Sequence, residues 1–253
     1  MTLTTVQVLA SGSDRFPPKG TAMKILEVEL TTTHLAATAE FYRDLLELPV
    51  TTQPEGIVVD IGSSRLRVTA GAAFDGVHHL AFGISPHDFD LARRWLRQRT
   101  ELITAGGSDI IDGPEGWDSR SLYFRGPEGI LLEFIAREAD RATPGSTDET
   151  PRLLSISEVG IGVPDVRQTV RHLAEAVELP PFPPQLPGFA PVGGHDGLLI
   201  LANAGRIWFP TQEDIPATGP VSARIATPGH DATVALTDEA VVRCVQAHPE
   251  FRT

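Results

Sequence analysis

The feature that most constrains the fold is an internal repeat that relates residues 24–49 to residues 154–180. Matching residues recur at a constant separation of 131: Glu27 with Glu158, Val28 with Val159, Leu30 with Ile161, Thr38 with Thr169, and Glu47, Leu48 and Pro49 with Glu178, Leu179 and Pro180. One register that holds across a strand, a helix and the turn after it indicates a duplicated structural unit. The chain is therefore predicted to consist of repeated supersecondary units.

The first copy of this unit reads as a strand, a helix and two further strands. Residues 24–32 (KILEVELTT) alternate apolar and polar side chains, which is typical of a half-buried strand. Residues 34–48 carry apolar side chains at helical spacing, and the helix is expected to end before Pro49. Strands are expected at 56–62 and 64–70. The unit is β-α-β-β, with room for one more strand.

Three more units are expected along the chain. The second begins with the strand VHHLAFGI at 77–84, and the third begins with the repeated segment at 154–180. The remaining elements predicted for these two units are a helix at 88–100 and strands at 119–126, 130–136, 188–194, 197–203 and 206–211. A fourth unit starts near 220–228 but has only about 25 further residues, so we expect it to be truncated, with Cys244 in a terminal helix.

The domain organisation follows from one linker. Residues 137–152 are rich in charge, Thr, Pro and Gly, which is typical of a connection between domains. This linker divides the chain into an intact pair of units at 24–136 and a degenerate pair at 153–253. Residues 1–22 precede the first strand and are expected to form a disordered extension. The predicted fold class is α+β.

Composition narrows the range of partners and compartments. The chain has 33 acidic and 21 basic residues, a formal charge of −12, and no local cluster of Lys and Arg, so nucleic acid is not an expected partner. No apolar stretch approaches the length of a membrane span, and the N-terminus is a poor signal peptide. The single cysteine, Cys244, excludes an intrachain disulfide and suits a reducing compartment. A cytoplasmic protein is expected.

Three stretches resemble one known family. EFYRDLLELP (40–49), HLAF (79–82) and WDSRSLYFRGPEGILLEF (117–134) are similar to motifs of the vicinal oxygen chelate superfamily, which includes glyoxalase I, extradiol dioxygenases and bleomycin-binding proteins. The resemblance implies tandem β-α-β-β-β modules that form cupped half-barrels, with a divalent metal on the concave face. Gly126, Ile130 and Glu47 depart from the family pattern at turns and at the helix exit.

Strand alternation separates the two adjacent histidines of VHHLAFGI. His79, Ala81 and Gly83 share one face of the predicted strand, and His78 lies on the other, so both histidines cannot bind one metal. We expect His78 to be structural. A second expectation concerns Glu133, which stands in the apolar strand ILLEFIA, where a carboxylate is costly unless it is paired or coordinated.

The resemblance implies Glu27, His79 and Glu133 as metal ligands, one from each of three strands. Glu27 has an alternative role on a solvent-facing strand, since Glu29 shares its face. Glu158 matches Glu27 through the repeat, but its copy of the unit lacks the His-x-Ala-Phe and Leu-Glu-Phe partners. Glu158 is therefore the less favoured ligand at this stage.

This ligand set favours one branch of the family's chemistry. Extradiol dioxygenases use two histidines and one carboxylate with Fe(II), whereas one histidine with two carboxylates is closer to glyoxalase I. The resemblance then implies Zn, Ni, Mn or Mg as a Lewis acid that stabilises an enediolate, with Glu27 or Glu133 as the proton-transferring carboxylate. Two alternatives stay open: an Fe-dependent dioxygenase, and a metal-free protein that binds a small molecule.

Several side chains are candidates for substrate contact. Trp117, Tyr123 and Trp208, together with Phe189, are expected to line an apolar cup for a small-molecule substrate. Arg120, and with it Arg125, could meet an anionic substrate, although both would also suit a solvated hairpin. The degenerate second half is expected to complete the cup or to form a homodimer contact.

Overall fold

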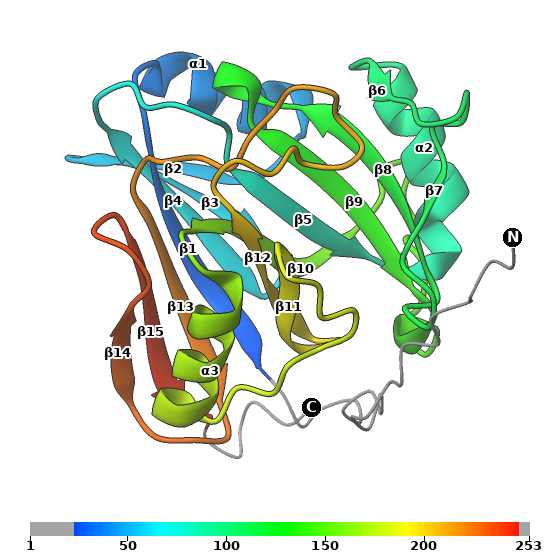
Figure 1. Cartoon of the computed structure of the whole chain (residues 1–253). Coiled ribbons are helices and arrows are strands. Elements are labelled where there is room, and N and C mark those ends of the chain that lie inside the picture. The colour runs from blue at the N-terminus through cyan, green and yellow to red at the C-terminus, as the bar shows by residue number, and fades with distance from the viewer. Residues whose placement is uncertain (1–22, 248–253) are drawn as a thin grey trace, which may run out of the picture.

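The computed structural model describes residues 23–247 as two β-sheets with three main helices (Figure 1). The strands are β1 (Lys24–Thr32), β2 (Val50–Gln53), β3 (Gly56–Ile61), β4 (Ser64–Ala70), β5 (His79–Ile84), β6 (Leu102–Ile103), β7 (Ile111–Asp112), β8 (Ser119–Arg125), β9 (Leu131–Arg137), β10 (Leu153–Val163), β11 (Phe189–Gly194), β12 (Gly197–Asn203), β13 (Val221–Thr227), β14 (Ala232–Ala235) and β15 (Ala240–Gln246). The helices are α1 (Leu35–Glu40), which continues as a π-helix over Phe41–Leu45, α2 (Phe89–Arg97) and α3 (Val166–Val177), with short 3₁₀ turns at Pro86–Asp88, Pro127–Gly129 and Glu138–Asp140.

The predicted fold class is confirmed: the fold is α+β, built from β-α-β-β-β-type modules in two cupped sheets. The first sheet has the strand order β14-β15-β13-β1-β4-β3-β2, and the second has the order β11-β12-β10-β5-β9-β8-β6, with β7 paired to β8. Each sheet therefore takes strands from both sides of the segment 137–152. The first unit shares a sheet with the fourth, and the second shares a sheet with the third.

The repeat is visible in the backbone as well as in the sequence. The pairing register of β1 shifts just before Glu27, and that of β10 shifts just before Glu158, so the same irregularity precedes both glutamates. Glu47 and Glu178, which end the two repeated helices, both have left-handed backbones, with φ of 54° and 56°. Glycine adopts this conformation more readily than glutamate, so both helix ends carry glutamate where glycine would be favoured.

Two predictions for the last third of the chain are wrong. Residues 206–211 form turns instead of a strand: the Trp208 N–H donates to the Asp214 carbonyl at 2.7 Å, and the Thr211 N–H donates to the Trp208 carbonyl at 2.8 Å. Cys244 lies in β15 and not in a helix. Every second residue from 240 to 244 is buried, which is the period of a strand. The predicted extension at 1–22 lies outside the described residues.

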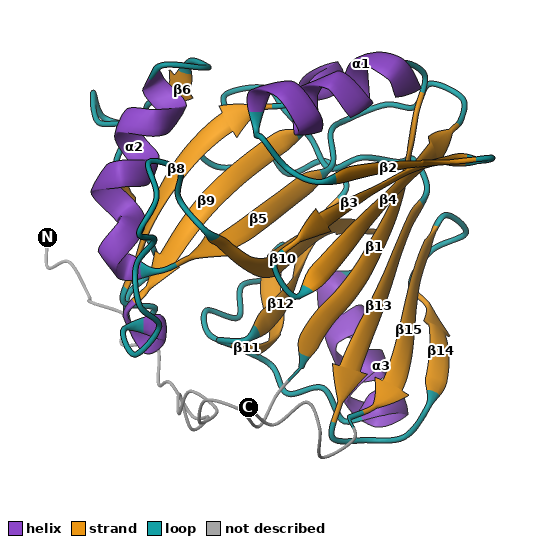
Figure 2. Cartoon of the chain, turned by 180° about the vertical axis from the view of Figure 1, so that it is seen from behind, coloured by secondary structure: helices purple, strands orange, loops and turns teal. Residues whose placement is uncertain are grey.

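The second sheet has two unlike faces. Leu80, Phe82 and Phe134 belong to the main apolar core on one face, and the Trp95 ring of α2 lies 6.4 Å from that of Phe134. Figure 2 shows α2 running along β8 and β9. The main apolar core continues from this face to the first sheet, where β10 contacts β1. The opposite face carries a smaller apolar cluster: Trp117, Leu131, Phe182, Leu198, Ile200, Ala202 and Trp208. This second face is the open side of the cup.

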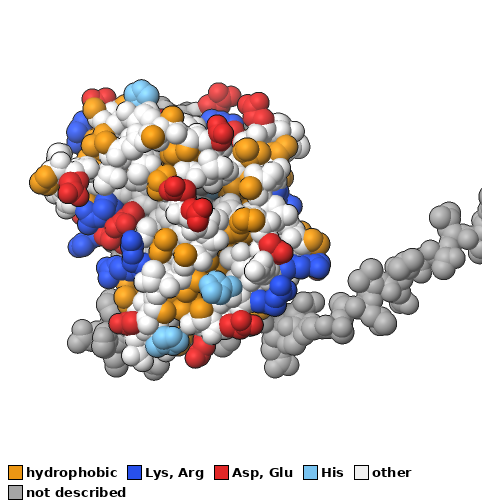
Figure 3. All heavy atoms as spheres, turned by 60° about the vertical axis from the view of Figure 1, so that its left-hand side comes forward, with side chains coloured by type: hydrophobic (Ala, Val, Ile, Leu, Met, Phe, Trp, Pro, Cys, Tyr) orange, Lys and Arg blue, Asp and Glu red, His pale blue; other side chains and the backbone are white. Residues whose placement is uncertain are grey.

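The surface is mixed in charge. On the face drawn in Figure 3, acidic, basic and hydrophobic side chains are interspersed and no one kind covers it. Within residues 23–247, no helix has the length and apolar character needed to cross a membrane.

His78 lies on the helix-covered side, opposite His79, as strand alternation predicted. Its ring packs edge-on against Phe74 with centroids 4.9 Å apart, and its Nε2 has no hydrogen-bond partner among the described residues. Burial lowers the pKa of His78 to about 4, because the charged imidazolium would be poorly solvated there. His78 is therefore a neutral, structural side chain.

This environment predicts an acid-sensitive contribution to stability. Since the folded-state pKa is below the unfolded value of 6.5, the contribution is complete above pH 6.5 and is lost as the pH falls toward 4. We expect His78→Phe to remove about 3 kcal/mol from the fall in unfolding free energy over this range, measured by urea denaturation. The same experiment on His172→Gln, an exposed position of α3, serves as the control. An unchanged pH slope in His78→Phe would contradict the assignment.

Candidate metal centre

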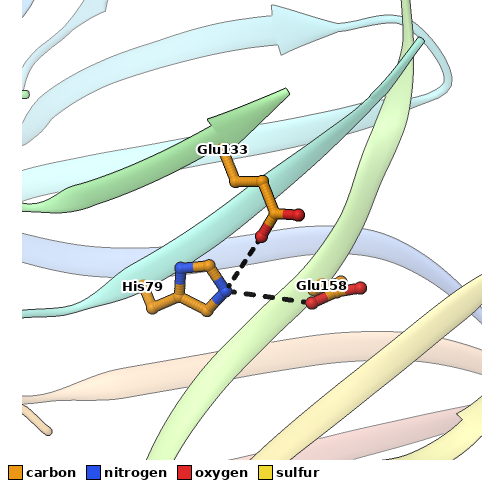
Figure 4. A group of neighbouring side chains, drawn as sticks. All are labelled: His79, Glu133 and Glu158. Carbon is orange, nitrogen blue, oxygen red and sulfur yellow. Dashed lines mark ion pairs between the residues drawn. The ribbon is translucent and has the colours of Figure 1, made fainter. Parts of the chain in front are cut away.

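Three neighbouring strands bring His79, Glu133 and Glu158 together on the open face of the second sheet (Figure 4). Strand β5 carries His79 and lies between β9, which carries Glu133, and β10, which carries Glu158. Ala81 pairs with Glu133 on one side and with Glu158 on the other, two residues along the same face from His79. The small Ala81 side chain leaves room for both carboxylates to turn toward the imidazole.

The group is compact and buried. His79 Nε2 lies 3.6 Å from Glu133 Oε2 and 3.8 Å from Glu158 Oε2. One ligand atom from each residue lies within 4.8 Å of the others. All three side chains are almost fully excluded from solvent. Such a convergence of hard oxygen and imidazole donors is typical of a divalent metal site.

The backbone of β9 orients His79. The Nδ1 atom lies 3.3 Å from the Leu131 carbonyl oxygen, which can accept its proton and leave the Nε2 lone pair toward the carboxylates. Burial lowers the pKa of His79, but the hydrogen bond and charge of Glu158, with the charge of Glu133, outweigh it and raise the pKa above its usual value. The His79 ring is therefore oriented so that Nε2, on the side of the two carboxylates, can bind either a proton or a metal ion.

Glu133 has a buried carboxylate whose hydrogen-bonding capacity is not fully used. Its Oε2 is buried and has no hydrogen-bond partner among the described residues. Burial, with the charge of Glu158, raises the pKa of Glu133 to about 7. The hydroxyls of Tyr123 and Ser121 also interact with this carboxyl. An orphaned carboxylate oxygen beside an imidazole and a second carboxylate fits a bound cation.

Arg137 forms an ion pair with Glu158 on the side away from His79. Its Nη2 donates to Glu158 Oε1 and its Nη1 donates to Ser157 Oγ, and the whole arginine side chain is buried. The two oxygens of Glu158 are therefore divided: Oε1 faces the guanidinium, and Oε2 faces His79. The sequence predictions did not include Arg137. A charged residue at the end of the apolar strand β9 was the signal that could have indicated it.

A pseudo-two-fold axis between β5 and β10 identifies a fourth position. Because His79 pairs with Gly160 and Ala81 pairs with Glu158, the axis relates His79 to Glu158. Glu133 lies beside Ala81, so its counterpart is the residue beside Gly160, which is Ile200. The chain thus supplies three candidate ligand side chains and an apolar wall at the fourth position, where Ile200 lines the cavity.

The structure places Glu27 in the other sheet and away from this group. Its carboxylate lies 3.7 Å from Arg67 Nη2, and Arg67 Nε lies 3.7 Å from Glu29. By the same symmetry in the first sheet, Arg67 stands at the position of Ile200, and Arg243 stands at that of Glu133. Glu27 is therefore ion-paired, and Glu158, its repeat partner, takes the expected place beside His79 and Glu133.

A cavity of about 360 Å³ opens above the group. Trp117, Tyr123, Phe189 and Trp208 line it, as expected for substrate contact. Arg120 does not, because on β8 it alternates with the inward Ser119, Ser121 and Tyr123 and lies over the Phe89 ring instead, 4.2 Å from its centroid. Arg125 pairs with Asp214 at 2.6 Å.

The loop after β12 closes one side of the site by packing Trp208 against His79. The two rings have centroids 5.5 Å apart, and Trp208 Nε1 donates to the Val77 carbonyl at 3.3 Å. Gly160 makes this approach possible, since a Cβ there would lie 3.0 Å from the Trp208 ring and 2.8 Å from His79 Cβ. The third unit thus contributes a ligand candidate and a wall.

Comparison with known proteins supports the sequence resemblance. Residues 24–134 match the family model of the Glyoxalase/Bleomycin resistance protein/Dioxygenase superfamily, which confirms the resemblance for that part of the chain. No curated protein sequence matches significantly.

Two solved structures extend the likeness over both halves. A "putative dioxygenase" from Bacillus subtilis is 13% identical, with a TM-score of 0.61 over 90% of this chain and 86% of that one. Glyoxalase I from Zea mays is 13% identical, with a TM-score of 0.55 over 88% of this chain and 92% of that one. At this identity the two structures show a shared fold.

The Arg137–Glu158 pair predicts a large, conditional loss of stability. Arg137→Met leaves a buried carboxylate without its partner, and we expect the unfolding free energy of metal-free protein to fall by about 3–5 kcal/mol. Adding Glu158→Gln should restore part of this loss, because a neutral amide needs no counter-charge. Guanidinium denaturation measures both, with Arg171→Met on the exposed face of α3 as the control. A double variant no more stable than Arg137→Met would contradict the pairing.

Proposed function

We propose that the chain is a divalent-metal-dependent enzyme that acts as a glyoxalase-type lyase or isomerase on a small substrate with two adjacent oxygen atoms. The observation that carries this proposal is the buried group of His79, Glu133 and Glu158, in which Glu133 Oε2 lacks a hydrogen-bond partner among the described residues. A cavity above the group gives a substrate access to it. The confirmed family resemblance is consistent with this assignment.

The donor set favours a metal that does no redox chemistry. One imidazole and two carboxylates suit Zn, Ni, Mn or Mg, whereas the Fe(II) oxygenase site uses two histidines and one carboxylate. When bound, such an ion would act as a Lewis acid toward the two substrate oxygens. The apolar side chain of Ile200 at the fourth position leaves that side of the centre to the substrate.

Charge balance, proton transfer and positioning are assigned to different residues of the chain. Arg137 balances the charge of Glu158. In the metal-free protein, burial and the charge of Glu158 raise the pKa of Glu133 to about 7, and a bound cation would lower this pKa and keep the carboxylate ionised. We assign to the Glu133 carboxylate, one oxygen of which would face the metal, the movement of a proton between adjacent substrate carbons. Tyr123 and Trp208 give the cavity aromatic walls beside His79, and the Leu131 carbonyl favours the His79 tautomer with its proton on Nδ1.

Metal content tests the ligand assignment directly. Protein purified without chelator is expected to retain a divalent metal, measured by elemental analysis. His79→Ala, Glu133→Gln and Glu158→Gln should each lower the affinity for this metal at least tenfold, and with it the metal content, because each removes one of three ligands. Glu27→Gln, at the matching position of the other sheet, should retain the metal. Retention in all variants, or loss in Glu27→Gln alone, would overturn the assignment.

Solvent exchange tests the chemistry. With hydroxyacetone in D₂O as a probe, we expect the protein to accelerate loss of the methylene proton signal in NMR spectra, and Glu133→Gln to abolish the acceleration because it removes both a proposed metal ligand and the proposed proton-accepting carboxylate. Oxygen consumption with catechol and bound iron would instead indicate the dioxygenase. Cavity binding without metal or exchange would indicate a metal-free binding protein.

The finer predictions for partners and location stay predictions. A homodimer contact through the second half and a cytoplasmic location are both consistent with the structure, and size-exclusion chromatography with light scattering measures the former.

A further inference from the structure

The cavity has two chemically different ends. At its floor lie the polar groups of His79, Glu133 and Glu158, and above them the walls are mostly apolar, with Trp117 and Phe189 among them. The volume of about 360 Å³ is at the lower end of ligand cavities in proteins, and it exceeds what a substrate of only two or three carbons would fill. The rest of the cavity therefore has to accommodate an apolar body.

The rim of the cavity carries exposed apolar side chains. Leu186 and Phe209 line the cavity, yet they are 47% and 61% exposed. Ile207, beside Phe209 but outside the lining, is 46% exposed. These three are the exposed large hydrophobic side chains of residues 23–247, and two of them, Leu186 and Phe209, lie at the mouth of this one cavity, which is typical of a surface that a ligand covers.

Arg206 lies at the same mouth and is the one arginine or lysine among the described residues that line the cavity. The charged side chains that join it in the lining are acidic: Asp112, Glu133 and Glu158. The Arg206 guanidinium lies 5.0 Å over the Phe189 ring, and no carboxylate within residues 23–247 forms an ion pair with it. Its hydrogen-bond donors are free to receive an anionic group that stands outside the apolar walls.

We propose that the substrate is an amphiphilic organic anion with three parts. Its reacting oxygen pair lies at the floor, an aryl or alkyl body fills the apolar cavity, and a carboxylate at the far end binds Arg206 at the rim. The assignment of the reacting end rests on the proposed function; the apolar body and the outer anion rest on the cavity and on Arg206 alone.

A matched set of four probes tests these two parts without any reaction. They are 3-phenylpropionate, 3-phenyl-1-propanol, propionate and 3-phenylpropylammonium, titrated into the full chain both as purified and after chelator treatment. Trp117 and Trp208 line the cavity, so quenching of tryptophan fluorescence reports binding, and calorimetry confirms it. We expect 3-phenylpropionate to bind about tenfold more tightly than the alcohol and far more tightly than propionate or the ammonium.

Single variants then separate the contributions. Arg206→Ala should weaken 3-phenylpropionate about tenfold and leave 3-phenyl-1-propanol unchanged, because only the former carries an anion. Phe209→Ser should weaken both aryl probes equally. Ile207→Ser and Arg171→Ala, outside the lining, are the matched controls and should change neither.

Each contrary result is informative. Equal binding of propionate, equal binding of acid and alcohol, or no effect of Arg206→Ala would overturn the proposal. If chelation abolishes 3-phenylpropionate binding while Arg206→Ala does not, the carboxylate binds at the floor and the outer site is wrong. If the protein holds no metal but the Arg206 effect persists, the proposed function fails and this inference stands.

Discussion

The site depends on the antiparallel pairing of β5 with β10. This pairing joins a strand that precedes the segment 137–152 to one that follows it, so neither half of the chain forms the cup alone. It also sets the register in which Ala81 lies beside Glu158, and that register brings the carboxylate to His79. A slip of one residue would turn Glu158 to the helix-covered face, where its charge would meet the main apolar core.

Once that register is fixed, the buried charges constrain one another. Glu133 and Glu158 both face His79, and two carboxylates in so small a space repel each other unless cations offset them. Arg137 supplies one positive charge, which forms an ion pair with one oxygen of Glu158. Burial, and after it the charge of Glu158, raises the pKa of Glu133, and the nearby cationic groups do not offset these two effects. The arrangement is therefore asymmetric: one carboxylate is held by the protein, and the other is left to a proton or a metal ion.

Local patterns in the sequence were sufficient to predict most helices and strands, but they did not predict which strands pair with one another. Alternation placed β1 at residues 24–32 and separated His79 from His78, and the period of 131 related Glu27 to Glu158. Which of those two glutamates joins His79 is decided by pairing between distant strands, and nothing within β1 or β10 encodes it. Residues 206–211 looked like a strand because they are apolar, yet their backbone groups form turns that hold Trp208 at the cavity.

The two sheets show how side chains alone can give one backbone plan different properties. In the first sheet, Arg67 and Arg243 stand where the second sheet has Ile200 and Glu133, and Glu27 stands where the second has Glu158. The arginines there satisfy Glu27 and Glu29 with ion pairs on a partly exposed face, so no carboxylate is left in need of a cation. In the second sheet, aromatic side chains line the cavity, the three polar side chains at its floor are buried, and the guanidinium of Arg137 pairs with Glu158. Between the two cups, as far as residues 23–247 show, low solvation and incomplete pairing of a carboxylate occur together in the second sheet, and this combination makes that cup, and not its duplicate, the candidate site for a metal ion and a substrate.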